Sequence, residues 1–192
     1  MKRAIVNGEE ISQAKVDFEL DRLMVFYKSH SMSSDEIRNS LNTLREKALE
    51  QAIGAKLLLD ESKKLDMPLS AIDIDNEIAK VIAQVGGEEN LRKMLAQKNI
   101  SEEDFRKHIE DAVRVNKLVS LTCSEAEEPE EEEVESFYQA HKSEYAPKTL
   151  VDVQNSIKDL LRHRNRGRAL QSLVEELKAS SQIKYIDDDL TK

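Results

Sequence analysis

Residues 4–20 read AIVNGEEISQAKVDFEL: a short apolar run, an Asn-Gly pair and then the start of a helical pattern. Asn7-Gly8 is the pair that most readily supplies the positive φ angles of a two-residue hairpin turn, so we expect a small strand or hairpin over residues 4–11. Ser12 occupies the N-cap position of a helix that we expect to run to about Ser29. The chain therefore opens with extended structure that leads directly into a helix.

The apolar residues of this first helix do not all lie on one face. At 3.6 residues per turn one stripe contains Val16, Leu20, Leu23, Met24 and Tyr27, which predicts the side that faces the core. Phe18 and Val25 fall on the opposite side, and Phe26 lies off the stripe. Apolar residues beyond a single face are more often core than binding site. If the stripe is the core, Phe18 and Val25 face either a second arm of the same molecule or a client.

Capping signals divide the rest of the chain into further helices. Ser33 and Glu36 form a capping-box pattern, and Gly86-Gly87 is typical of a helix end. The expected elements are helices from Ser33 to about Lys64, from Ser70 to about Val85, from Leu91 to Gln97, from Ser101 to about Val119, from the acidic run 127–133 to about His141 and from Val151 onward, and a strand over residues 182–186. After Gly167 the apolar positions of the last helix change side, so this helix either bends or serves two surfaces.

Composition predicts a mainly α protein of elongated shape. Of the 192 residues 39% are hydrophobic and 35% are charged, which is typical of long solvated helices. The net charge of -9 repels nucleic acid and anionic membranes, and no apolar run approaches the roughly 18 residues of a membrane helix. We therefore expect no nucleic-acid partner and no membrane insertion. No apolar signal segment follows Met1-Lys2-Arg3, which predicts a cytoplasmic protein as written, or a periplasmic or extracytoplasmic one if a signal was removed.

Candidate sites for chemistry are weak. The four histidines show no metal-binding spacing, and the single Cys123 is typical of a buried or spectator thiol. Residues 72–77 contain the acids of a calcium loop but not its central glycine, and no glycine-rich phosphate loop is present. The basic run 162–168 has no interleaved aromatics, which favours pairing with the abundant glutamates over nucleic-acid binding. We expect no cofactor, no metal and no enzymatic activity.

The order of the segments resembles SurA-type chaperones and parvulin-linked foldases over nearly the whole chain. The segments that carry the resemblance are AIVNGEEISQAKVDFEL, ALEQAIGAKLLLDESKKLDMPLS, GGEENLRKMLAQKNISEEDFRKHIEDAVRVNKLV, EEEEVESFYQAHKSEY and IKDLLRHRNRGRALQSLVEELKASSQIKYI. The resemblance implies an elongated, mainly α, multi-helix SurA-like fold in which a small sheet pairs Ile5-Val6 with residues 184–186. It also implies one module over residues 1–192. Within it, residues 1–66 supply the N-terminal strand and long helices, residues 67–124 a helical sub-bundle, and residues 125–192 the returning helices and C-terminal strand.

In such proteins a parvulin isomerase domain usually follows the HKSEY-like helix end, where this chain has only residues 146–149. The resemblance thus implies a chaperone module without isomerase activity that binds unfolded or nascent polypeptides in a helical cradle without ATP, on a plan similar to trigger factor. For client contacts we predict Phe18, Val25, Phe26, Tyr27 and Met32, with Phe137 and Tyr138. The alternative is a helical adaptor or structural protein with one defined partner, and a homodimer stays open.

Overall fold

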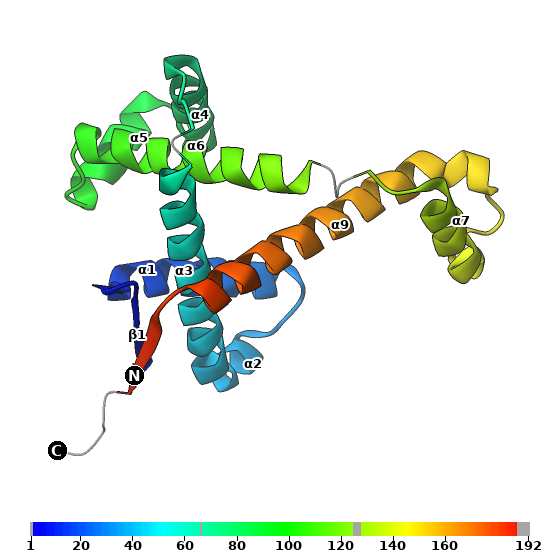
Figure 1. Ribbon diagram of the computed structural model, residues 1–192, viewed down its shortest axis with the longest axis horizontal. Helices are drawn as coiled ribbons and strands as arrows, with labels where there is room; N and C mark the ends of the chain where they lie inside the picture. Colours follow the sequence, from blue (N-terminus) through cyan, green and yellow to red (C-terminus); the bar gives the residue numbers. More distant parts are fainter. Residues whose placement is uncertain (1, 66, 125–127, 188–192) are drawn as a thin grey trace. The chain divides into compact units, whose positions relative to one another are not determined.

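The computed structural model describes residues 2–65, 67–124 and 128–187 of the chain (Figure 1). These residues form a mainly helical protein with a small antiparallel sheet, as predicted. The chain divides into two compact units, one made of Met1–Lys64 with Val174–Lys192 and the other of Leu65–Leu173. We call them the terminal unit and the central unit. The terminal unit thus joins both ends of the chain.

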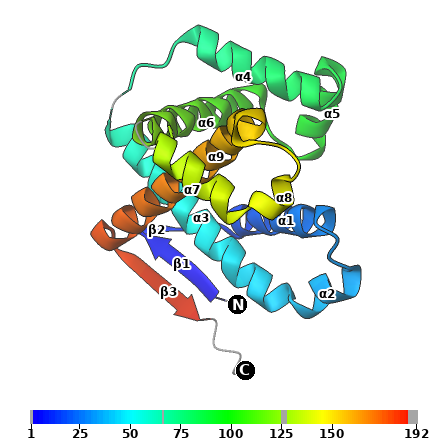
Figure 2. The ribbon, with the colours of Figure 1, turned by 90° about the vertical axis from the view of Figure 1, so that its right-hand side faces the viewer.

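The sheet of the terminal unit has the strand order β2-β1-β3. Its strands are β1 (Lys2–Val6), β2 (Glu9–Glu10) and β3 (Ile183–Asp187), and Figure 2 shows β3 beside β1. Asn7 and Gly8 have φ angles of 50° and 88°, so the predicted two-residue turn is confirmed. The predicted pairing of the two chain ends is confirmed as well, because Ile5 is opposite Lys184 in the antiparallel register.

Three helices follow the hairpin in the terminal unit: α1 (Gln13–Ser29), α2 (Ser34–Asn39) and α3 (Leu41–Lys64). Val16 and Leu20 of α1 are buried in one cluster with Ile53 and Leu57 of α3, which confirms the predicted stripe. Figure 1 shows α1 crossing α3. Ser12 stands at the N-cap of α1 as expected, but its side chain makes no capping hydrogen bond.

The long helix expected from Ser33 to Lys64 is interrupted. Its capping box is confirmed, since the Glu36 backbone N–H donates to the Ser33 hydroxyl and the Ser33 N–H donates to the Glu36 carboxylate. However, α2 ends at Asn39 and α3 begins at Leu41, with Ser40 between them. Asn and Ser side chains compete with the backbone for hydrogen bonds and so favour helix ends, which explains the break at this Asn-Ser pair.

The central unit contains the remaining helices. They are α4 (Ala71–Gln84), α5 (Glu88–Gln97), α6 (Glu102–Cys123), α7 (Glu131–Ala140), α8 (Lys142–Tyr145) and most of α9 (Leu150–Ser180). The Ser70 hydroxyl caps α4, and Gly86 and Gly87 end it with φ angles of 81° and 119°, as the sequence indicates. Cys123 is buried. Glu127, the first residue of the predicted acidic helix start, lies outside the described residues.

The last helix, α9, serves two surfaces without interruption. In the central unit its residues Ile157 and Leu161 are fully buried in a cluster with Val134 and Tyr138 of α7. In the terminal unit, Val174 packs so closely that a Cβ on Gly54 of α3 would lie 3.4 Å from it. The apolar positions on the two sides of Gly167 therefore serve two surfaces, which is one of the two alternatives predicted for this helix.

Deletion of residues 182–192 should loosen α1. Strand β3 pairs with all five residues of β1, and Val6 belongs to the same buried cluster as Val16 and Leu20. Each lost backbone hydrogen bond costs about 1 kcal/mol, so we expect amide exchange over residues 13–29 to accelerate by at least about tenfold. Hydrogen exchange followed by mass spectrometry measures this. Unchanged exchange in α1 would show that the returning strand does not support it.

Acidification should destabilise the central unit. A hydrogen bond from Lys117, with a further one from Ser70, lowers the pKa of Asp73; hydrogen bonds from Thr149 lower the pKa of Asp152. A carboxyl with a lowered pKa in the folded state contributes stability above its unfolded pKa of about 4, and this contribution is lost as pH falls through the folded pKa. Denaturation midpoints should therefore fall from pH 7 to pH 3, and less steeply in Asp73→Asn. A midpoint that rises on acidification would contradict this account.

Candidate functional site

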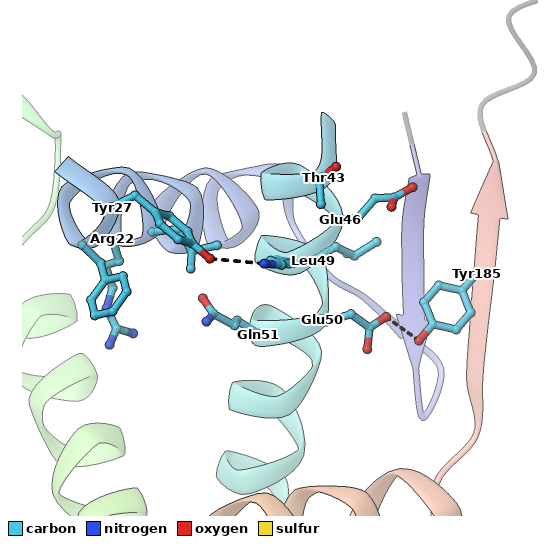
Figure 3. Close-up of a pocket in the computed structure, with 11 residues that line it drawn as sticks. Arg22, Tyr27, Thr43, Glu46, Leu49, Glu50, Gln51 and Tyr185 are labelled. Carbon is cyan, nitrogen blue, oxygen red and sulfur yellow. Dashed lines mark hydrogen bonds between the residues drawn. The ribbon is translucent and has the colours of Figure 1, made fainter. Parts of the chain in front are cut away.

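The terminal unit contains an open groove of about 1060 Å³ between α1, α3 and β3 (Figure 3). One wall comes from α1, the floor from the exposed side of α3, and the other wall from β3. The residues that line it are Arg22, Leu23, Phe26 and Tyr27 of α1, Thr43, Glu46, Lys47, Leu49, Glu50 and Gln51 of α3, and Tyr185 of β3. Segments far apart in the sequence thus form one concave surface.

The walls of the groove are aromatic. Phe26 is 53% exposed, and its ring meets that of Tyr27 edge to face, with centroids 5.5 Å apart. Tyr185 is 49% exposed, and Figure 3 shows it on the opposite side of α3 from Tyr27. Each ring therefore keeps a large apolar area available while it stays fixed at one edge of the groove.

The floor is polar, and its charged groups hold the walls in place. The Lys47 ammonium donates to the Tyr27 hydroxyl at 3.2 Å, and the Glu50 carboxylate accepts from the Tyr185 hydroxyl at 2.7 Å and from the Lys178 ammonium at 3.0 Å. Burial raises the pKa of the Tyr185 phenol, and the hydrogen bond to Glu50 raises it further. Tyr185 therefore stays protonated at neutral pH and keeps donating to Glu50, which anchors β3 to α3.

An exposed face of α1 continues the groove outward. It contains Phe18, Arg22, Val25 and Phe26, which we call the outer face of α1. Phe18 is 60% exposed and Val25 67%. The Arg22 guanidinium lies 5.9 Å from the Phe18 ring centroid and donates to both carboxylate oxygens of the buried Glu19. Because residues three, four and seven apart are neighbours on a helix, these side chains form one continuous strip that ends in the groove at Phe26.

The predicted client-contact residues fall in different environments. Phe26 and Tyr27 line the groove, and Met32 is partly buried against the core of the terminal unit. Phe137 and Tyr138 belong to the central unit, in the cluster between α7 and α9. Tyr138 is only 7% exposed, and its hydroxyl donates to the Lys148 carbonyl at 2.9 Å. Tyr138 is therefore a packing residue, because α9 covers it, and we remove it from the candidate surface.

Several groove residues were not predicted. Tyr185 was assigned only to a strand, although the period-two alternation places it on the same face as Ile183, which packs against the core. Lys47, Glu50 and Gln51 were part of an ordinary solvated helix face in the sequence. No local signal distinguishes them, since the groove exists only because α1 packs on one side of α3 and Tyr185 of β3 reaches Glu50 on the other.

Other kinds of site find no support in the described part of the chain. Over residues 2–65, 67–124 and 128–187, no cluster of three or more His, Cys, Asp or Glu side chains is suited to a metal ion. No helix in these ranges combines the length and apolar character that a membrane span requires. The basic run pairs with acids, as predicted: Arg162 bonds to both carboxylate oxygens of Glu128 at 2.9 Å, and Arg164 pairs with Glu133.

Comparison with known proteins agrees with this architecture. The model of the SurA-like N-terminal domain family matches residues 2–119, whereas no curated protein sequence matches the chain. A solved structure from a study of PEB4, a virulence factor, and the periplasmic protein Cj1289, two structurally related SurA-like chaperones of Campylobacter jejuni, matches with a TM-score of 0.57 and 16% identity. The match covers 96% of this chain and 98% of that one, and at this identity it shows a shared fold. Since the family model covers more than half of its length, the chain belongs to the SurA-like N-terminal domain family.

Proposed function

We propose that this protein is an ATP-independent chaperone that binds unfolded or nascent polypeptide segments in the groove and along the outer face of α1. The observation that carries the proposal is the combination of aromatic walls with a polar floor. Phe26 and Tyr185 offer flat apolar surface to side chains of many shapes, while Thr43 and Gln51 offer hydrogen-bonding groups to a backbone. Such a surface suits an extended chain of variable sequence.

The openness of the groove supports reversible binding. Its aromatic side chains are about half exposed, so a client segment would bury only part of its surface there. The free energy of binding equals the energy of the contacts minus the cost of ordering the client chain. Because a shallow groove makes few contacts, the net free energy of binding is small. Weak binding lets a client leave without nucleotide hydrolysis.

Met32 and Phe137, both partly exposed, are secondary candidates for client contacts. We also propose that the two units act together as one SurA-like module.

Suppression of aggregation tests this proposal. A chemically denatured client is diluted into buffer with increasing amounts of the protein, and aggregation is followed by light scattering. We expect a dose-dependent decrease in scattering without nucleotide and no further change when ATP is added. Scattering equal to that with an inert protein of the same concentration would contradict the proposal. If the protein instead binds one folded partner at fixed stoichiometry and has no effect on unfolded clients, it is a helical adaptor or structural protein.

The protein should not catalyse prolyl isomerisation. Between α8 and α9 the chain contains only residues 146–149, at the place where the resemblance puts a parvulin domain. We expect the cis-to-trans rate of a prolyl peptide to equal the uncatalysed rate, which is on the order of 10–100 s per event at 25 °C. A protease-coupled peptide assay with a known isomerase as positive control measures this. Acceleration that grows with protein concentration would show an active site elsewhere in the chain.

A further inference from the structure

One short motif occurs twice in the chain, once in each unit. Residues 26–30 read FYKSH and residues 137–141 read FYQAH. The first motif ends α1 and the second ends α7, and in both the histidine is the C-cap residue. The sequence pattern Phe-Tyr-x-x-His therefore marks two helix ends of the same kind.

The two motifs have similar geometry, with the two rings inclined by 32° in the first and 20° in the second. The rings of Phe26 and His30 have centroids 4.1 Å apart, as do the rings of Phe137 and His141. In each pair the histidine Nδ1 lies within hydrogen-bond distance of the phenylalanine carbonyl oxygen, at 2.8 Å and 2.9 Å. Because a carbonyl only accepts hydrogen bonds, Nδ1 carries the hydrogen in both. Each imidazole is thus fixed to its own helix end and supports the phenylalanine ring beside it.

The motifs differ in what else contacts the phenylalanine. The Arg164 guanidinium lies 5.9 Å from the ring centroid of Phe137 and is paired with the Glu133 carboxylate. In the described part of the chain no lysine or arginine lies over Phe26 in this way, and its ring is 53% exposed in the groove. The motif in the central unit is therefore complete with a cation, whereas the motif in the groove presents the same ring without one.

The groove that exposes Phe26 is lined by two carboxylates and two cations. Glu46 and Glu50 line the groove, and Glu50 accepts two hydrogen bonds although a carboxylate has about four acceptor positions. The cations of the groove are already engaged: Arg22 bonds to both oxygens of Glu19, and Lys47 donates to the Tyr27 hydroxyl. The net charge of -9 on the whole chain attracts cationic segments as well.

We propose that the groove prefers client segments that carry an arginine, whose guanidinium lies over the Phe26 ring as the Arg164 guanidinium lies over the Phe137 ring. This inference rests on the proposed function and names the client chemistry that the groove selects. Arginine fits better than lysine, because a planar guanidinium can lie flat on a ring while its N–H groups reach a carboxylate.

Two matched peptides test this preference. Both are short, unstructured and fluorescently labelled, with the same apolar and neutral polar residues, and they differ only in one central arginine or citrulline. Citrulline keeps the length and planar shape of arginine without its charge. We expect the arginine peptide to bind about two- to fivefold more tightly in fluorescence polarisation, the range of an exposed cation–π contact. The difference should shrink at high salt, because the groove is open to solvent.

Two variants locate the preference. Phe26→Leu keeps an apolar side chain and should make the two peptides bind equally, whereas Phe105→Leu, the matched change in the central unit, should keep the difference. Equal binding of both peptides to the unmutated protein would overturn the inference and leave the proposed function intact. A preference that survives in Phe26→Leu would also overturn it, because the cation site would lie elsewhere. Failure of both peptides to bind would overturn the proposed function together with the inference.

Discussion

Replacing Ile53 with alanine should lower the free energy of unfolding of the terminal unit by about 2–5 kcal/mol. Ile53 is fully buried on α3, in the cluster that also contains Val6 of β1 and Leu20 of α1. The substitution removes three carbon atoms from a site where sheet and helices meet. Part of the cost is lost burial of apolar surface, and the rest is the cavity that the surrounding chain fills only incompletely.

Phe18→Ala is the matched control for this loss. It removes a larger side chain from the same unit, but Phe18 is 60% exposed, so the free energy of unfolding should change by less than about 1 kcal/mol. Urea denaturation followed by circular dichroism measures both variants. If Phe18→Ala costs as much as Ile53→Ala, Phe18 belongs to a packed core and the outer face of α1 is not a free surface.

The triple variant Phe18→Ala, Val25→Ala, Phe26→Ala should lose most of the protection that the protein gives to a denatured client. These side chains supply the exposed apolar area of the outer face of α1, and each is more than half exposed. Their removal takes little packing from the fold, and alanine is the best helix former, so the melting temperature should change by no more than about 4–8 °C. Light scattering of the client and thermal denaturation of the variant measure the two effects separately.

A second triple variant controls for general surface hydrophobicity. Ile72→Ala, Leu121→Ala and Val151→Ala remove three apolar side chains of the central unit that are each more than half exposed as well. We expect this variant to protect the client as well as the unmutated protein does. Equal loss of protection in both variants would mean that any exposed apolar residue contributes. Full protection by the α1 variant would place the client surface elsewhere in the molecule.

The elements of the fold could be predicted because their signals are local. Asn7-Gly8 specifies its turn through backbone angles, and Ser33 with Glu36 specifies a helix start through reciprocal hydrogen bonds. The break at Ser40 was missed for a related reason. Ile37 and Leu44 keep the helical period on both sides of it, and the apolar pattern therefore reads as one helix. Periodicity reports which face is buried but not whether the backbone is continuous.

The groove could be predicted only in part. The outer face of α1 follows from the spacing of Phe18, Val25 and Phe26 along one helix, and their exposure agrees with it. Tyr185 joins the same surface only because β3 pairs with β1, more than 170 residues away in the chain. For Tyr138 the error has the same origin, since its burial depends on contacts with α9. Long-range packing thus decides which aromatic residues stay accessible, and a single sequence does not show it.

The most direct test of the central claim is a map of client binding on the protein itself. Hydrogen exchange is measured by mass spectrometry with and without a permanently unfolded client, in the absence of nucleotide. The account predicts slower exchange over residues 22–27 of α1 and 43–51 of α3, with residues 71–123 of the central unit unchanged. Two results would contradict the claim that the groove of the terminal unit holds the client. One is slower exchange confined to residues 71–123. The other is unchanged exchange everywhere at a client concentration at which the protein prevents aggregation.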